Sequence, residues 1–284
     1  MGAVLSLHGV SKRYGKVQAL EDLTLEVLEG EVFGFLGPNG AGKTTTIRIV
    51  LGLISADRGG FSAPPRELIG YLPGELALWP ERTGAETLGL LARLSGRPPL
   101  WRERLLGSLE LDEGALRRRV RTYSDGMKQK LGLVQALQCA PRLAVLDEPT
   151  KGLDPLMQQS FYAVLEELRN DGVTVFFSSH ILTEVERVSD RVGMIRSGRL
   201  VALGGVDEVR RAQRRRVRAA FAEPVDAASL CSFGEVISRD GTAVELLVSQ
   251  AELPALIARL GMLPLADLEV EPPRLEDAFL EYYR

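Results

Sequence analysis

A glycine-rich octapeptide at residues 37–44 constrains the fold of this chain more than any other feature. It satisfies the pattern G-x-x-x-x-G-K-[ST] at every specified position. The apolar run 32–36 before it predicts a buried strand, and residues 44–51 predict a following helix. In such a unit, backbone N–H groups and the helix N-terminus converge and favour a bound anion. The expected phosphate-binding residues are Gly37, Pro38, Asn39, Gly40, Ala41, Gly42, Lys43, Thr44 and Thr45.

The two polar side chains that close the octapeptide have separate expected roles. Lys43 is expected to reach the β- and γ-phosphates of a nucleoside triphosphate, and the Thr44 hydroxyl is expected to bind Mg²⁺. GTPases, kinases and motor ATPases share this loop, so it indicates the ligand class without choosing among them. A GTPase is disfavoured because the chain has no Asn-Lys-x-Asp segment to read guanine.

Composition and charge limit the number of domains, the kinds of partner and the cellular compartment to be expected. Its 284 residues allow one large domain or two unequal ones, and a net charge of −3 does not suggest a nucleic-acid partner. Cys139 and Cys231 form no closely spaced pair, so we expect a reducing, cytoplasmic environment without disulfides or a zinc site. The N-terminus lacks a signal-peptide pattern, and no window approaches the ~20 apolar residues of a membrane helix. Any membrane role is therefore expected to be peripheral, through a partner.

Strand and helix patterns alternate along most of the chain. The first thirty residues predict an antiparallel meander, and residues 82–122 predict a set of helices. Apolar runs at 143–147 and 173–178 predict two more buried strands, with a helix between them that begins at Pro155. This alternation implies an α/β fold with a mainly parallel core sheet.

Acidic and imidazole side chains follow the two later strands. Asp147 ends the first of them, where a carboxylate beside a phosphate loop holds the Mg²⁺ shell. Glu148, the next residue, is placed to orient or deprotonate an attacking water. His180 follows the second strand, and a histidine at the carboxyl edge of a parallel sheet faces the ligand crevice. These residue types point to hydrolysis of a terminal phosphate.

Two further segments complete an ordered set of motifs: Tyr-Ser-Asp-Gly-Met-Lys-Gln at 123–129, before Asp147, and Gly-Leu-Asp-Pro at 152–155, after it. With them, residues 4–205 resemble the ATP-binding subunit of an ABC transporter. The resemblance implies that the first segment is the signature loop, with Ser124 and Gly126, and that the second is the D-loop, with Asp154. It also implies that His180 is the switch histidine and that Tyr14 stacks on adenine, a contact that suits an aromatic face.

The resemblance further implies a fold and a shared mechanism. The fold is a P-loop ABC ATPase with an N-terminal antiparallel β subdomain and a helical subdomain at about residues 76–140. Two ATPase subunits, identical or different, close head to tail around two ATP molecules with Mg²⁺. In each site one subunit gives the phosphate loop and its acids, and the other gives Ser124 and Gly126.

The finer resemblance is to the exporter-type, ABC-2-like branch of the family. This resemblance rests on the amino-acid sequences of the signature loop and of the final segment, residues 273–283. In that branch the ATPase pairs with a separate integral-membrane permease. We therefore expect a cytoplasmic protein held at the inner face of the membrane through a permease, with no nucleic-acid partner.

Three departures from the family pattern bear on hydrolysis. The family usually has Gln after the Tyr-Leu-Pro element, where this chain has Gly74 and then Glu75; Glu75 is a candidate oxygen ligand of Mg²⁺, and water is the alternative. The segment before that element is short and includes a loop-like stretch at 55–68. Asp125 adds an acid near the expected trans γ-phosphate, which would weaken closure unless Lys128, arginine side chains or Lys151 compensate its charge. Lys151 itself stands where a small residue is common.

A change of composition near residue 209 predicts a boundary between an ATPase domain, 1–208, and an accessory domain, 209–284. Arginines begin the second domain, and we interpret them as a solvated helix or linker face; the alternative is contact with anionic lipid headgroups. They are Arg210, Arg211, Arg214, Arg215, Arg216 and Arg218. Beyond them, a strand pattern at 244–248 and a helix pattern at 253–260 predict a small α+β module for packing or dimerisation.

Two other functions stay open at this point. A soluble ABC ATPase that acts on DNA or ribosomes is disfavoured because the chain has neither long coiled coils nor a second ATPase domain. A poorly hydrolysing regulatory or scaffold protein is suggested by Gly74 and Asp125. The intact Lys43, Asp147, Glu148 and His180 oppose it.

Overall fold

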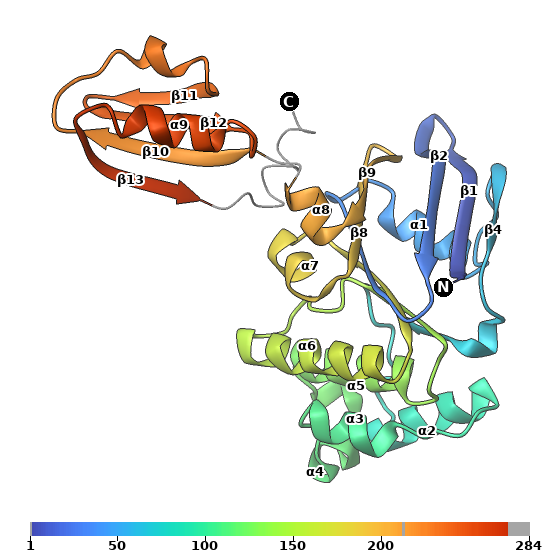
Figure 1. The fold of residues 1–284 in the computed structure, drawn as a ribbon. Coiled ribbons are helices and arrows are strands. Elements are labelled where there is room, and N and C mark those ends of the chain that lie inside the picture. Colours follow the sequence, from blue (N-terminus) through green and yellow to red (C-terminus); the bar gives the residue numbers. More distant parts are fainter. Residues whose placement is uncertain (1, 212–213, 272–284) are drawn as a thin grey trace. The chain divides into compact units, whose positions relative to one another are not determined.

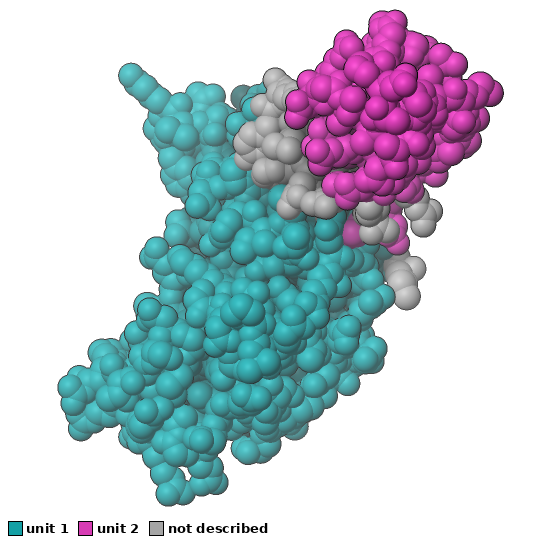
Figure 2. All heavy atoms as spheres, turned by 90° about the vertical axis from the view of Figure 1, so that its left-hand side faces the viewer, with its two compact units in different colours: residues 1–204 teal, residues 205–284 magenta. Residues whose placement is uncertain are grey.

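The chain forms two compact units, Met1–Gly204 and Gly205–Arg284, which Figure 2 colours separately. The structure is a computed structural model that describes residues 2–211 and 214–271. The C-terminal segment 273–283, which carries part of the resemblance to exporter-type ATPases, lies outside the described residues. No helix in the described part of the chain is long and apolar enough to cross a bilayer.

A six-stranded sheet in the order β5-β6-β7-β3-β8-β9 forms the centre of the first unit. Its first five strands run parallel, which confirms the predicted α/β fold. Every residue of the three middle strands β6, β7 and β3 is buried, and Phe33 stacks on Phe176 with ring centroids 5.7 Å apart. The strands are β3 (Val32–Leu36), β5 (Ile69–Leu72), β6 (Leu143–Asp147), β7 (Thr174–Ser179), β8 (Arg191–Arg196) and β9 (Arg199–Gly205).

Three helices follow strands of this sheet. They are α1 (Lys43–Val50), α6 (Pro155–Asn170) and α7 (Leu182–Val188). Helix α6 begins at Pro155, as predicted, because the Asp154 carboxylate accepts a hydrogen bond of 2.9 Å from the N–H of Met157. Its buried face comprises Met157, Phe161, Tyr162, Val164, Leu165 and Leu168.

A separate antiparallel sheet holds the N-terminal strands in the order β2-β1-β4. Strands β1 (Ala3–Tyr14) and β2 (Val17–Leu28) form the predicted hairpin, but β4 (Arg58–Ser62) lies where the sequence predicted a loop. That prediction is wrong because Gly59 of β4 allows close packing against β1 instead of forming a turn. A Cβ on Gly59 would lie 2.4 Å from the backbone oxygen of His8, so only glycine fits beside β1.

Helices α2 to α5 gather at one end of the first unit (Figure 1). They are α2 (Gly84–Ser95), α3 (Arg102–Ser108), α4 (Glu113–Arg117) and α5 (Asp125–Leu137), with short 3₁₀ turns at Arg66–Leu68 and Val120–Thr122. Thr83 and Glu86 form a capping box that fixes the start of α2. Helix α5 packs so closely on β5 that a Cβ on Gly70 would lie 2.1 Å from the backbone oxygen of Ala136.

The second unit has its own sheet, in the order β11-β12-β10-β13, and its own apolar core. Its elements are α8 (Val206–Arg211), β10 (Arg215–Phe221), a 3₁₀ turn (Ala227–Leu230), β11 (Glu235–Asp240), β12 (Ala243–Val248), α9 (Leu253–Leu260) and β13 (Leu265–Glu271). The helices and strands agree in kind with the α+β content predicted for this part of the chain.

The arginine run does not form a single helix or linker face. Arg210 and Arg211 end α8, whereas Arg215, Arg216 and Arg218 lie in the strand β10, whose alternate residues Val217 and Ala219 are buried. Arg216 pairs with Glu245 of the neighbouring strand at 2.7 Å, and Arg214 pairs with Glu235 at 2.9 Å. The charges of this run are therefore partly balanced within the sheet.

Candidate nucleotide site

The glycine-rich loop connects β3 to α1 in a shape that only glycine permits at key points. Gly42 has φ of 114° and Gly40 has φ of 79°, both in the left-handed region. A Cβ on Gly42 would lie 2.7 Å from the backbone oxygen of Ala19, and one on Gly37 would lie 2.4 Å from that of Ile195. The strands β2 and β8 therefore hold the loop from both sides.

Lys43 is buried at the start of α1 and points back over the loop. Its ammonium donates hydrogen bonds to the backbone oxygens of Gly37 at 2.7 Å and Pro38 at 3.1 Å, and lies 3.8 Å from Glu148 Oε1. Burial lowers the pKa of Lys43 below the usual 10.5, while the charges of Glu148 and Asp147 oppose this shift. A phosphate that enters the loop would replace these contacts with stronger ones.

Asp147 and Thr44 form an oxygen-rich pair suited to Mg²⁺. The Thr44 hydroxyl donates to Asp147 Oδ2 at 3.1 Å, and the Ser178 hydroxyl donates to Asp147 Oδ1 at 2.5 Å. Within residues 2–211 and 214–271, no group of three or more His, Cys, Asp or Glu forms a metal cage. Proteins usually bind Mg²⁺ through one or two oxygen ligands of their own, and phosphate and water supply the remaining ligands. The residues present here fit this ion.

Glu148 is held in a fixed position next to this pair. Its φ of 49° is uncommon for a side chain of this kind, and its N–H donates to the Ser178 hydroxyl at 3.1 Å. Glu148 Oε1 lies 3.1 Å from His180 Nδ1, and the His180 side chain is exposed. The imidazole can therefore orient the carboxylate while remaining accessible to a ligand.

A cleft of about 410 Å³ opens beside Thr44, Asp147 and Glu148. Gly74, which stands where the family usually has Gln, lines this cleft. A Cβ on Gly74 would lie 3.4 Å from Asp147 Oδ2, an ordinary contact. Burial, and then the charge of Asp147, raise the pKa of Tyr71 in its wall. The remaining lining residues are Arg48, Pro73, Glu75 and Lys151.

The residues expected to act across a dimer lie elsewhere in the unit. The Ser124 hydroxyl caps α5 by accepting from the N–H of Met127 at 3.2 Å, and neither Ser124 nor Gly126 lines the cleft. The exposed Asp125 carboxylate pairs with Lys128 at 3.0 Å, as the sequence suggested for one compensating charge. A Cβ on Gly126 would lie 3.5 Å from the backbone oxygen of Gly152, so the signature loop adjoins the D-loop of the same chain.

Tyr14 ends β1 with its ring exposed, in the hairpin whose second strand touches the phosphate loop through Ala19. The Lys12 ammonium lies 5.7 Å from the ring centroid. The Asp154 carboxylate caps α6 by accepting a hydrogen bond from the N–H of Met157.

Two side chains that matter to the geometry were not assigned a role from the sequence. Ser178 joins Asp147 to the backbone of Glu148, and Gln129 is buried with its amide donating to the backbone oxygen of Pro149 at 2.7 Å. The only signal for Ser178 is a hydroxyl at the end of a buried strand next to the acid-bearing strand.

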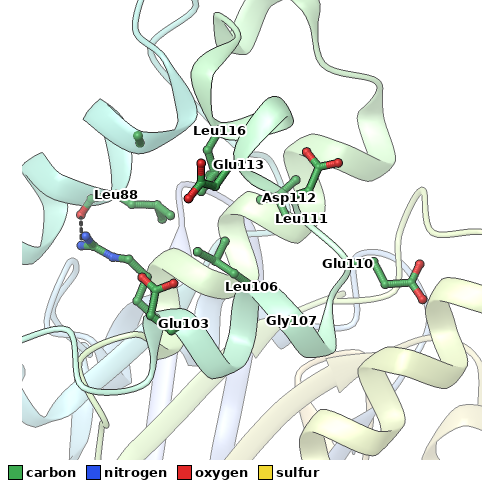
Figure 3. Close-up of a pocket in the computed structure, with 11 residues that line it drawn as sticks. Leu88, Glu103, Leu106, Gly107, Glu110, Leu111, Asp112, Glu113 and Leu116 are labelled. Carbon is green, nitrogen blue, oxygen red and sulfur yellow. Dashed lines mark hydrogen bonds between the residues drawn. The ribbon is translucent and has the colours of Figure 1, made fainter.

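A second cavity, of about 570 Å³, lies among α2, α3 and α4 and contains none of the phosphate-loop residues. Its walls combine leucines, such as Leu88 and Leu106, with the carboxylates of Glu103 and Glu113 (Figure 3). The Arg102 guanidinium donates to the backbone oxygen of Leu88 at 3.0 Å, which ties α3 to α2. This cavity belongs to the helical part of the unit and is separate from the nucleotide cleft.

Comparison with known proteins agrees with this geometry. The profile of the ABC transporter family matches residues 20–151. The ABC transporter ATP-binding protein YhcH of Bacillus subtilis is 33% identical over 99% of this chain and 96% of its own length. This chain belongs to the ABC transporter ATP-binding proteins. As a member of that family, the protein is an ATP-binding ATPase subunit of a transporter.

Other relatives of this ABC ATPase differ in how much of the chain they cover. The linearmycin resistance ATP-binding protein LnrL of Bacillus subtilis is 34% identical over 71% of this chain and 69% of its own length. A solved ATP-binding subunit of an ABC transporter matches with a TM-score of 0.68 and 34% identity, over 73% of this chain and 92% of that chain. Residues 213–271 match the profile of the EvrA-like ABC transporter C-terminal domain.

Proposed function

We propose that this protein is the motor subunit of an ABC exporter, which closes as a dimer on ATP and drives a separate permease. The observation that carries the proposal is the convergence of Lys43, Thr44, Asp147, Glu148 and His180 at the carboxyl ends of β3, β6 and β7. A parallel sheet binds its ligand at that edge.

The chemistry follows from the contacts of these residues. Lys43 and the loop N–H groups neutralise the phosphates of ATP. Thr44 and Asp147 would hold Mg²⁺, which would supply further neutralisation of the phosphate charge. Glu148 accepts a proton from the attacking water, while His180 keeps the Glu148 carboxylate in position. Tyr14 stacks on the adenine ring.

The second half of each site comes from a second ATPase subunit. Ser124 and Gly126 lie at the N-terminus of α5, away from the cleft of their own chain. Helix α5 is thirteen residues long. Its N-terminus can bind the γ-phosphate of an ATP held by the facing subunit, because the unpaired N–H groups and the dipole of the helix favour negative charge there. ATP then holds two subunits together, and hydrolysis releases them.

The proposed setting is the inner face of the membrane, where a permease anchors the motor. The support is the family membership and a relative, LnrL, whose name concerns linearmycin resistance. Export is proposed because the signature loop resembles that of exporter-type ATPases.

The direct test is affinity purification of the tagged full-length protein from detergent-solubilised membranes, followed by mass spectrometry. We expect a stoichiometric polytopic membrane protein to copurify. Recovery of soluble partners alone, such as ribosomal or DNA-bound proteins, would instead favour a soluble ABC ATPase or a regulatory role.

A further inference from the structure

Acidic side chains outnumber basic ones in the lining of the cleft beside Thr44. Three carboxylates line it, from Glu75, Asp147 and Glu148. Two cations, Arg48 and Lys151, line the same cleft. ATP has a γ-phosphate and ADP does not, so a cation that reaches the γ-phosphate would favour ATP over ADP.

Lys151 is placed by the same turn that places Glu148. Its N–H donates to the backbone oxygen of Glu148 at 3.1 Å, and Gly152, with φ of 78°, turns the chain away immediately afterwards. No carboxylate of the described segments, 2–211 and 214–271, forms an ion pair with the Lys151 ammonium. Lys151 therefore combines a fixed backbone with an ammonium group that has no direct carboxylate partner in the described part of its own unit.

We propose that Lys151 binds the γ-phosphate of ATP from within its own subunit and so makes the site prefer ATP to ADP. The inference rests on the proposed assignment of Glu148 to the water that attacks the γ-phosphate. A residue whose backbone bonds that of Glu148, and whose side chain lines the same cleft, lies on the γ-phosphate side of the site. Glu75, the acid that follows Gly74, lines the same cleft.

The test measures nucleotide affinity instead of turnover. The parent is the full-length Glu148→Gln protein, which leaves bound ATP intact, and the probes are Mg·ATP and Mg·ADP in isothermal titration calorimetry. Lys151→Ala should weaken ATP binding by about 10- to 100-fold, the effect of one lost hydrogen bond to a charged group, and ADP binding by less than about twofold. Lys151→Arg, which keeps the charge, should recover most of the ATP affinity.

Lys130→Ala removes a lysine of α5 that does not line the cleft, and it serves as the matched control with unchanged affinities. Equal losses for ATP and ADP in Lys151→Ala would show that Lys151 acts through folding, and unchanged ATP affinity would show that it does not reach the phosphate. Either result overturns the inference. Failure of the parent to bind any nucleotide would instead overturn the proposed function.

Discussion

A single hydroxyl organises the two acids of this nucleotide site. Ser178 donates to Asp147 and accepts from the N–H of Glu148, so the proposed metal-binding acid and the proposed base are held by one oxygen of the neighbouring strand. The phosphate loop, Asp147, Glu148 and His180 were predictable because their spacing is restrictive. Ser178 was not, because a serine at a strand end has no distinctive spacing and gains its meaning only from the register of β6 and β7.

Glu148→Gln should retain ATP binding and slow hydrolysis by about 10²- to 10⁴-fold, the usual contribution of a general base. The amide keeps the shape of the side chain but cannot accept the proton of the attacking water. Phosphate release under saturating Mg·ATP measures the rate, and Glu26→Gln, on an exposed position of β2, is the matched control. Turnover equal to the unmodified protein would remove Glu148 from the mechanism.

At the scale of elements, helix α5 joins the helical part of the first unit to the central sheet. The backbone of α5 lies against Gly70 of β5, and Gln129 ties the same helix to the loop after β6. Helix α5, which begins at the signature loop, is thereby joined both to β5 and to the loop that follows Asp147 and Glu148. Neither contact can be read from local sequence, because each joins residues far apart in the chain.

Gly70→Ala should destabilise the protein by about 1–3 kcal/mol or more, because the added methyl group overlaps the backbone oxygen of Ala136. Gly89→Ala is the matched control: this glycine of α2 has nothing within 4 Å of an added Cβ, so alanine should stabilise by about 0.5–1 kcal/mol. Chemical denaturation monitored by circular dichroism compares the two. Similar effects of both substitutions would contradict the close approach of α5 and β5.

The two incorrect interpretations of the sequence have a common physical origin. Gly59 and Gly60 in β4, and the arginines of β10, suppress the local pattern of a strand. Pairing with a neighbouring strand overrides that local signal in both cases: β4 joins β1, and β10 joins β12 and β13. By contrast, β3, β6 and β7 were predicted because continuous apolar runs mark strands buried on both faces.

For the molecule as a whole, each proposed site is incomplete in one copy of the chain. Thr44, Asp147 and Glu148 line the cleft, whereas Ser124 and Gly126 do not. The composite site is the reason that nucleotide state and oligomeric state are expected to change together.

In the Glu148→Gln background, Mg·ATP should convert the protein from monomer to dimer in sedimentation velocity runs, and Mg·ADP should not. Gly126→Ala should fold normally, because its Cβ makes only an ordinary contact of 3.5 Å with Gly152, yet it should weaken the dimer by about tenfold or more by crowding the facing γ-phosphate. Gly89→Ala should dimerise like its parent. A Gly126→Ala protein that dimerises equally well would place the signature loop outside the interface.

The residues beyond Gly204 have their own apolar core, and this bears on how the second unit is inherited among related ATPases. Val217, Leu246 and Leu256 pack with one another and do not contribute to the core that supports the phosphate loop. A module that carries its own stabilising interior can be gained, lost or exchanged by gene fusion without rebuilding the catalytic machinery. Among relatives of this ATPase, we therefore expect the C-terminal module to follow a different pattern of inheritance from the motor.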